Sequence, residues 1–597
     1  MSPALSRLDA AIDLARRHLL SLRAGAYWEG HLSSSAVSTA VATLALAVAG
    51  DERDHTAVRR GTAWLVGDQN HDGGWGDTPD SPSNLAATLL AICALTACHA
   101  GGEEALARAR EHLAGALGVT SAGIADAVHR RYGTDRTFAA PILATCALAG
   151  LVSWSEVPAL PFELAMLPRS LHRRAGLQVV SYALPALIAV GAVTHRRSPA
   201  RNPLVRAIRR WSLSPALRLL PRLQPDGGGF LEAAPLTAFV ALCLEPVTGP
   251  HHEVVRGCLS FLRRTVRPDG SWPIDTNLSV WVTTNALSAL RHSGGIPLDV
   301  GERARLWLLE CQHAQAHPFT GAEPGGWAWT HLPGGVPDAD DTAGAVIAMA
   351  GMGEHDAAMR GAMWLVQLRN ADGGWPTFCR GWGRLPFDRS SPDITAHALR
   401  AVATLAELAA PNAAHIARLV AVNVSRFAGF AFRYLEASQR EDGSWVPLWF
   451  GNQYAPGQRN LVYGTARVLA AYADCGRADD AAAARGVGYL LRAQNPDGGW
   501  GGAEGVDSSV EETALAVSAL SRFGSSPGVR EAVMDGTGYL LARLEDGSWT
   551  EPAPIGLYFA SLWYSESLYP VAWGLEALAR ARDALAGERA GAEPSSP

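Results

Sequence analysis

The apolar residues of this chain come in long helical runs that alternate with short glycine-rich turns. The clearest runs, rich in Ala, Leu, Thr and Val and apolar on nearly all sides, cover residues 84–97, 279–290, 342–350, 393–405, 461–471, 511–520 and 569–578. A helix without a polar face is buried all round, so we expect an all-α fold in which these segments form the inner rings of double-walled helical barrels. No alternating pattern of useful length predicts a β-strand.

A Gly-Trp turn separates most of these runs and repeats along the chain. The turns contain Trp75, Trp272, Trp327, Trp375, Trp445, Trp500 and Trp549, and weaker copies stand at 27–28 and 227–230. From Trp272 onward they recur at intervals of roughly 50 to 70 residues, which fits one helical hairpin and its loop per unit. Several copies carry a Gln just before the turn, whose amide can stack on the indole and bond to neighbouring helix ends. We therefore interpret the repeated Trp residues as structural.

The chain is too long, at 597 residues, for one simple core, so we expect two domains. The pattern predicts an N-terminal helix within residues 1–26 and a first α/α barrel at 27–299. A second barrel follows at 300–585, and residues 586–597 are small and polar, which predicts a disordered tail.

Composition excludes several classes of protein. Apolar residues make up 48% and charged residues 18%, as in a folded, core-rich chain. All 51 basic residues are Arg, and the net charge of -6 gives no reason to expect nucleic acid as a partner. The eight Cys are scattered without a CxxC pair, which indicates buried, reduced thiols of a cytosolic protein. Residues 1–26 contain acids and no continuous hydrophobic segment, so we predict neither a signal peptide nor a transit peptide.

Residues 169–210 break the rhythm because they carry many Arg residues and no acid. Within this segment, residues 175–193 have no charge, but the run is barely long enough to span a bilayer and contains Pro185. We predict a helix that dips into one leaflet, with Arg pairs on the headgroups, and admits a lipid-soluble substrate. This would make the protein monotopic or peripheral on the cytoplasmic face of a membrane. The alternative is an outer barrel helix buried against a neighbour.

Three carboxylates open one apolar run, in the sequence Pro337-Asp338-Ala339-Asp340-Asp341-Thr342-Ala343. An ordinary helix cap needs one Asp or Ser, whereas like charges this close push at least one carboxyl toward its protonated form. In a ring of inner helices the N-terminal ends converge, so residues far apart in sequence can meet there. We interpret the cluster as a site that holds a proton.

This motif, set among the repeated Gln and Gly-Trp elements, resembles the squalene-hopene cyclases and their relatives among the protonation-initiated (class II) terpene cyclases. The resemblance covers nearly the whole chain. It implies that Asp340 is the general acid and that Asp338 and Asp341 are its polarising neighbours. The sequence Asp393-Ile394-Thr395-Ala396-His397 is similar to a family motif whose His bonds to the acid. His397, which alone would be taken for a core histidine, would then orient Asp340, and Asp393 lies one helical turn before it.

The resemblance also implies an aromatic cavity that stabilises a carbocation, with a cation–π attraction of about 0.5 to 2 kcal/mol per ring. Trp329 stands where the hopene cyclases have a cation-stabilising Phe, and Phe378 where they have a Tyr. The other residues that resemble this lining are Trp281, Leu461, Tyr463, Tyr558, Phe559, Trp563, Tyr564 and Tyr569. Without the motif, each of these aromatic residues is expected in the core.

The chain departs from the family at positions that affect the product. Leu461 replaces a Tyr thought to return a proton to the acid, and Val282 follows Trp281 where the family often has Asp. Residues 33–40 replace an acidic stretch, and residues 380–389 replace a longer loop. The reprotonation route, the shape of the cavity and the product therefore stay open.

The function that we expect is cyclisation of a linear isoprenoid. Asp340 protonates a terminal alkene of squalene or a similar polyprene, rings close in sequence, and a base or water ends the cascade. The scheme requires no metal or organic cofactor, and a homodimer would fit the family. The alternative within the class is a shorter prenyl chain or a prenylated aromatic compound.

Three further interpretations compete with this one. The Asp residues could bind magnesium for a diphosphate, but the second metal motif of ionisation-initiated terpene synthases is not found. A protein prenyltransferase subunit shares the barrel but needs a zinc set of Asp, Cys and His that the spacing does not provide. A catalytically silent, lipid-binding barrel would have no need for carboxyls at the start of an apolar helix.

Overall fold

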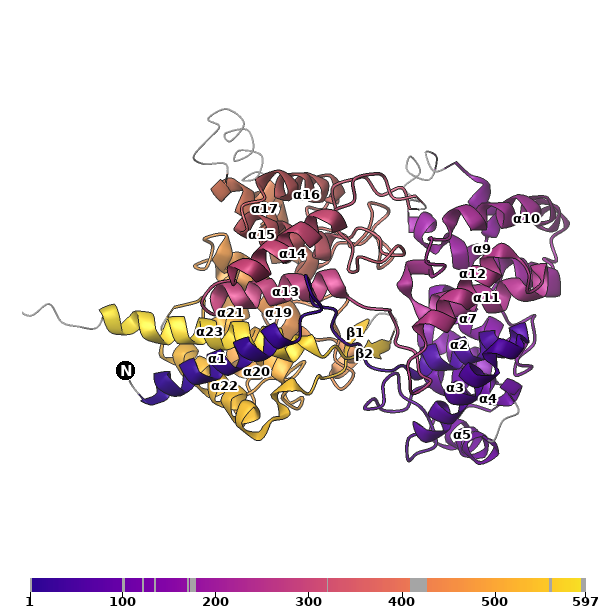
Figure 1. The fold of residues 1–597 in the computed structure, drawn as a ribbon, viewed down its shortest axis with the longest axis horizontal. Helices are drawn as coiled ribbons and strands as arrows, with labels where there is room; N and C mark the ends of the chain where they lie inside the picture. Colours follow the sequence, from indigo (N-terminus) through magenta and orange to yellow (C-terminus); the bar gives the residue numbers. More distant parts are fainter. Residues whose placement is uncertain are drawn as a thin grey trace, which may run out of the picture.

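Helices form nearly all the regular structure of the computed structural model. It describes residues 3–98, 102–120, 123–133, 136–168, 171, 179–318, 320–408, 427–524, 526–557 and 561–591. The helices gather in two bodies that lie side by side (Figure 1). The predicted all-α fold of two helical barrels is thus confirmed. One hairpin, β1 (Ile555–Leu557) with β2 (Leu562–Tyr564), was not predicted, because strands of three residues are too short to show an alternating pattern.

The first body is an α/α barrel whose inner helices form a closed ring, in which each contacts the next. This ring consists of α2 (Ala36–Ala49), α4 (Leu85–Cys98), α7 (Arg136–Leu148), α9 (Val179–Arg197) and α11 (Ala234–Thr248). The outer layer consists of α3 (His55–Gly67), α5 (Glu103–Gly115), α6 (Ile124–Tyr132), α10 (Pro203–Leu223) and α12 (Glu253–Thr265).

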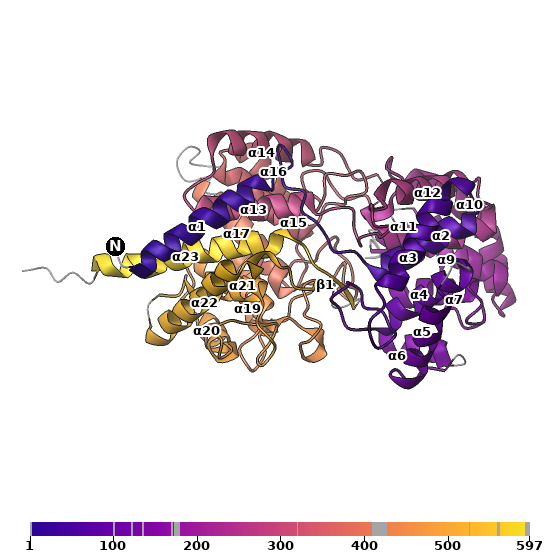
Figure 2. The ribbon, with the colours of Figure 1, turned by 60° about the horizontal axis from the view of Figure 1, so that its bottom comes forward.

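The second body is also an α/α barrel with a closed inner ring. Its inner helices are α13 (Ser279–His292), α15 (Ala339–Gly351), α17 (Pro392–Leu408), α19 (Leu461–Asp474), α21 (Val510–Leu520) and α23 (Leu568–Gly591). Around them lie α14 (Leu298–Cys311), α16 (His355–Leu368), α20 (Ala481–Ala493) and α22 (Pro527–Asp546). The N-terminal helix α1 (Pro3–Ser21) also packs here, alongside α23 (Figure 2).

One pair of hydrogen bonds recurs at the buried Gly-Trp turns. At Trp375 the indole N–H donates to the Leu365 carbonyl at 2.7 Å, and the backbone N–H donates to Thr395 Oγ1 at 2.9 Å. The indole thus holds an outer helix and the amide holds an inner one. The same pair occurs at Trp28, Trp75, Trp272, Trp327, Trp445 and Trp500. Trp549 lies partly exposed in a 3₁₀ turn instead.

Two of these turns connect segments that are far apart in the chain, and each thereby helps to close the inner ring of helices in one barrel. Trp28 donates to Thr283 on α13, and Trp272 donates to Thr39 on α2. One buried hydrophobic cluster therefore spans residues 36–272 with a few later residues, and the other joins residues 8–32 to residues 274–581. Residues 8–32 and α13 belong to the second cluster, although the sequence placed residues 27–299 in the first barrel.

The apolar run that was predicted to enter a membrane is an inner barrel helix from Val179 onward. On α9, Ile188, Ala189 and Val190 are fully buried, as the alternative interpretation expected of a barrel helix, but α9 lies in the inner ring and not in the outer layer. Residues 172–178 lie outside the described residues, as do 592–597 of the predicted tail. None of the helices in the described ranges combines the length and apolarity needed to cross a bilayer.

Candidate active site

The acid cluster is placed by Asp338, which caps the N-terminus of α15. Its Oδ1 accepts the backbone N–H groups of Asp340 and Asp341, both at 2.9 Å. Its own N–H donates to the carbonyl of Trp327 at 3.0 Å, so a Gly-Trp turn fixes the start of the helix. Asp338 is therefore an ordinary helix cap. Asp340 and Asp341 are the two further carboxyls that a cap alone does not require.

The cluster holds protons at neutral pH. Burial raises the pKa of Asp338 to about 8 and that of Asp341 well above its ordinary value, and repulsion between the carboxylates adds to both shifts. Asp338 and Asp341 are 3% and 6% exposed, whereas the Asp340 side chain is 14% exposed. Asp340 is thus the carboxyl that a molecule outside the cluster can touch.

His397, on the neighbouring inner helix α17, contacts this carboxyl. Its Nδ1 lies 2.6 Å from Asp340 Oδ1. Burial, together with the positive charge of Arg467, lowers the pKa of His397 to about 4, so the ring is neutral at pH 7. Arg467 Nη2 lies 3.2 Å from the same ring nitrogen. The carboxyl of Asp340 and the guanidinium of Arg467 therefore approach the same nitrogen of the imidazole.

Asp393 lies at the start of the same helix as His397 but bonds elsewhere. Its carboxylate accepts the hydroxyl of Ser391 and the backbone N–H of Leu448, the latter at 3.2 Å. Burial raises its pKa to about 6. The residue thereby ties the beginning of α17 to the segment that follows the Trp445 turn.

Aromatic rings from the inner helices α13 and α19 lie close to His397 and Asp340. Trp281 meets the His397 ring edge-on at 6.1 Å and lies 6.0 Å from Phe450. Tyr463 on α19 stacks on Phe450 at 4.5 Å, and its raised pKa reflects burial with a contribution from Asp340. Trp281 and Tyr463 are thus brought to the acid. Leu461 is the first residue of the same helix. It is partly buried and packs against the hydrophobic cluster of the second barrel.

The C-terminal aromatic residues continue this lining. Tyr569 stacks on Trp573 at 4.6 Å, and its hydroxyl lies 3.2 Å from that of Tyr564. Trp563 is buried, and its backbone N–H donates to Asp77 of the first barrel at 3.1 Å. Tyr558 and Phe559, both predicted to line the cavity, lie outside the described residues.

A second aromatic group stands where the two barrels meet. The Phe378 ring lies 6.1 Å from Trp329 and 5.8 Å from Trp449. Tyr182 of the first barrel donates its hydroxyl to the Phe378 carbonyl at 3.0 Å. Next to Phe378, the Thr377 carbonyl accepts the N–H of Ala339 within the acid motif at 2.8 Å. The acid-bearing end of the second barrel therefore faces the first.

Several residues of this site were missed by the sequence reasoning. They are Tyr182, Phe387, Trp449, Phe450, Arg467 and Trp573. Arg467 had a visible signal, because it is the one charge inside the apolar run 461–471. Trp449 and Phe450 follow the Trp445 turn much as Phe378 follows the Trp375 turn, so comparison of the repeats could have found them. Within the described ranges, no group of three or more His, Cys, Asp and Glu side chains is arranged to hold a metal ion.

The buried carboxyls predict how stability changes with pH. The pKa of Asp338 rises from 3.8 to about 8 on folding, so between these values the folded chain holds a proton that the unfolded chain has lost. The free energy of unfolding therefore falls as pH rises through this window. Asp338→Asn keeps a good helix cap and should make that decline shallower, by up to about 1.4 kcal/mol per pH unit. Urea unfolding at several pH values measures this, and an unchanged slope would contradict it.

Comparison with known proteins matches both halves of the chain. A family described as "Squalene-hopene cyclase C-terminal domain" matches residues 278–583, and one described as "Squalene-hopene cyclase N-terminal domain" matches residues 12–213. The chain is 26% identical to enfumafungin synthase from Hormonema carpetanum over 612 residues, which cover 85% of this chain and 43% of that one. It is 32% identical to drimenyl diphosphate synthase from Streptantibioticus cattleyicolor over 341 residues, covering 54% and 56% of the two chains. It therefore spans about half the length of each of these two relatives.

One solved structure has the same overall fold. The ent-copalyl diphosphate synthase from Streptomyces platensis is 20% identical, with 97% of this chain and 100% of that chain covered and a TM-score of 0.58.

Proposed function

The chain belongs to the squalene-hopene cyclase family, and from that premise we propose that it is a class II terpene cyclase. Asp340 protonates a terminal alkene of a linear isoprenoid, and the resulting cation drives ring closure. The observation that carries this proposal is the contact between Asp340 and His397 inside a buried, proton-holding carboxyl cluster.

Protonation of an alkene needs a strong acid that is shielded from bulk water. Burial raises the pKa of Asp338 and of Asp341, so these two carboxyls beside Asp340 hold protons at neutral pH. Once Asp340 has given up its proton it carries a negative charge. The cation of Arg467, whose Nη2 lies 3.2 Å from the ring nitrogen of His397 that contacts Asp340, offsets that charge and so lowers the free energy of the ionised acid.

The carbocation that forms next must be stabilised by groups that do not react with it as nucleophiles. The rings of Trp281, Phe450 and Tyr463 lie beside the acid, and the group of Trp329 and Phe378 lies at the junction of the barrels. Each ring face contributes a cation–π attraction of about 0.5 to 2 kcal/mol, depending on how dry the site is. Successive ring closures would move the charge along this aromatic lining.

Squalene is the first substrate to test. A second candidate is a shorter prenyl chain, favoured by the 32% identity to drimenyl diphosphate synthase and by the bulky rings of Trp329 and Trp449 beside Phe378. Purified protein would be given squalene, then farnesyl and geranylgeranyl compounds, with and without a metal chelator, and the products analysed by mass spectrometry. Product from squalene supports the first candidate, and product only from shorter chains supports the second. If nothing cyclises, the lipid-binding barrel becomes the better account.

We also propose peripheral contact with a membrane, through α10 rather than α9. Leu204, Ile208 and Trp211 are 68%, 44% and 72% exposed, and their spacing puts them on one face of the helix. Arg206 and Arg210 are exposed on the adjoining face, where they could meet anionic headgroups. Such a stripe would give an isoprenoid a route from lipid to the cavity. The cytoplasmic location and a homodimer stay predictions.

The α10 stripe can be tested with vesicles that contain phosphatidylglycerol. Leu204→Asp should weaken partitioning at least tenfold, since burial of one Leu contributes about 1.5 to 3 kcal/mol and tenfold corresponds to about 1.4 kcal/mol. Leu298→Asp is the matched control, because Leu298 is 93% exposed on the second barrel. Equal loss in both variants, or in neither, would contradict a role for α10.

A further inference from the structure

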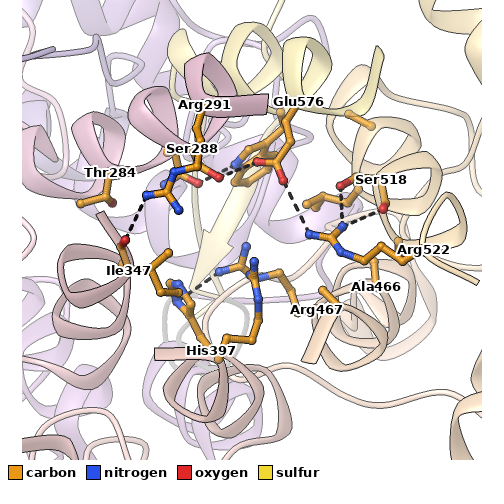
Figure 3. Close-up of a pocket in the computed structure, with 18 of the residues that line it drawn as sticks. Thr284, Ser288, Arg291, Ile347, His397, Ala466, Arg467, Ser518, Arg522 and Glu576 are labelled. Carbon is orange, nitrogen blue, oxygen red and sulfur yellow. Dashed lines mark hydrogen bonds and ion pairs between the residues drawn. The ribbon is translucent and has the colours of Figure 1, made fainter. Parts of the chain in front are cut away.

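A cavity of about 70 Å³ lies inside the second barrel, beyond His397 from the acid (Figure 3). All the inner helices α13, α15, α17, α19, α21 and α23 contribute to its wall. It runs from His397 toward the C-terminal ends of these helices, so it is the axial lumen of the barrel. A volume of this size holds roughly five waters or one small ion with its hydration.

The lumen contains more positive than negative charge. Four guanidinium groups line it, those of Arg291, Arg400, Arg467 and Arg522, and the guanidinium of Arg580 lies near them outside the lining. The carboxylates that face them are Asp474, which pairs with Arg400 at 2.6 Å, and Glu576, which pairs with Arg580 at 2.7 Å. Five cations against two anions leave three positive charges. The nearby His292 adds none at pH 7, because burial lowers its pKa to about 4.

Helix ends compensate part of this excess. Arg291 donates to the Ile347 carbonyl at 3.0 Å, and Arg522 donates to the Ser518 carbonyl at 2.7 Å. Both carbonyls lie near the C-terminal end of an inner helix, where the helix dipole is negative. Arg522 also pairs with Asp474 at 3.2 Å and with Glu576 at 3.7 Å, carboxylates that it shares with Arg400 and Arg580. Among the described residues, no carboxylate forms an ion pair with Arg291, so its contact with a helix end supplies less than a full negative charge.

Arg467 is not compensated in this way. It stands in the middle of α19, donates toward the neutral His397 ring, and lies 5.9 and 5.8 Å from the rings of Trp281 and Tyr463. Among the residues that the structure describes, no carboxylate forms an ion pair with it. In Figure 3 the side chains of Arg291, Arg467 and Arg522 point into the same space. A guanidinium has five N–H donors, and most of those of Arg467 remain available to a ligand.

We propose that this lumen binds a small oxyanion of the phosphate type. Such an anion carries about two negative charges and several acceptor oxygens, which match guanidinium groups in charge and in geometry. The small volume of the lumen favours free inorganic phosphate over a diphosphate that carries a prenyl chain.

The bound anion would regulate the acid, a consequence that rests on the proposed function. In the proposed reaction, the cation of Arg467 offsets the negative charge that Asp340 carries once its proton has passed to the alkene. An oxyanion next to Arg467 cancels that assistance. Cyclisation should therefore slow as the site fills, whatever the concentration of isoprenoid.

The binding is tested on the whole protein by calorimetry and thermal unfolding with inorganic phosphate, at an ionic strength held constant with chloride. Saturable binding and a melting temperature that rises with phosphate are expected. Arg467→Gln should weaken the binding at least tenfold and leaves no carboxylate without its partner. Arg522→Gln is a second variant, and Arg218→Gln, at an exposed position on α10, is the matched control.

Phosphate that does no more than chloride, or that binds both lumen variants as tightly as the wild type, would overturn the proposal. A prenyl thiodiphosphate is tested as a second ligand in the same binding measurements. If it binds through Arg467 and Arg522 while inorganic phosphate does not, the site serves a substrate headgroup and the free-phosphate proposal fails. Because binding is measured without turnover, the result stands apart from whether the protein cyclises any substrate.

Discussion

Asp340→Asn should lower the rate of cyclisation by at least about 10³-fold while the protein stays folded. General acids contribute about 10² to 10⁴ to rates, and here the acid supplies the proton that creates the cation. An Asn side chain has the same shape and can still bond to His397, but it has no acidic proton. The measurement is initial product formation by gas chromatography and mass spectrometry, with circular dichroism to show that the helices persist.

The matched control for this variant is Asp546→Asn. Asp546 is half exposed, bonds to Ser548 in the turn before Trp549 and pairs with the partly exposed Arg543, far in sequence from the acid motif. It should retain wild-type activity. If Asp340→Asn keeps more than about a tenth of the rate, another carboxyl of the cluster supplies the proton, and the role assigned to Asp340 is wrong.

Trp375→Ala should lower the free energy of unfolding by about 3 to 5 kcal/mol, the largest effect on stability that we expect from one residue. The side chain is fully buried between an inner and an outer helix, and its loss leaves a cavity. It also leaves the Leu365 carbonyl, which accepts the indole N–H at 2.7 Å, without that donor. Urea unfolding followed by circular dichroism measures the change.

Trp211→Ala is the control for that measurement, because its ring is 72% exposed on α10 and its removal opens no cavity. It should change the free energy of unfolding by less than about 0.5 kcal/mol. Similar losses in the two variants would mean that the repeated Trp residues are not the ties between the helical layers.

Much of the fold could be predicted from the sequence because the inner helices have no polar face. The run at 461–471 corresponds to α19 at Leu461–Asp474, and the run at 342–350 to α15 at Ala339–Gly351. The second prediction began three residues late because the acids Asp340 and Asp341 lie inside the first turn, behind the cap. Helix ends depend on such caps more than on hydrophobic pattern.

The sequence could not show which helices belong to which barrel, because that depends on contacts between residues far apart in the chain. Nothing near Trp28 shows that its partner is Thr283, more than 250 residues away. The burial of α9 was missed for a related reason, since a barrel helix and a membrane-associated helix have the same apolar composition. Only the packing of the first barrel shows that α9 is inside and the stripe on α10 outside.

The acid site was predicted in part. The resemblance pointed to Asp340 and His397, which lie 57 residues apart and 2.6 Å from each other. It gave no position for Arg467, whose side chain reaches His397 only because of the way α19 is turned in the barrel. Residues outside a known motif are found by a break in the pattern, here one charge in an apolar run.

The measurement that tests protonation by Asp340 most directly is cyclisation in D₂O with an accepted substrate. If the acid of the protein starts the reaction, each product molecule gains one deuterium at the carbon that receives the proton, and Asp340→Asn gives no product. The mass of the product would then be one unit higher than that of the product made in H₂O. A cyclic product with no added deuterium would contradict the account, because the cation would then have formed by loss of a leaving group.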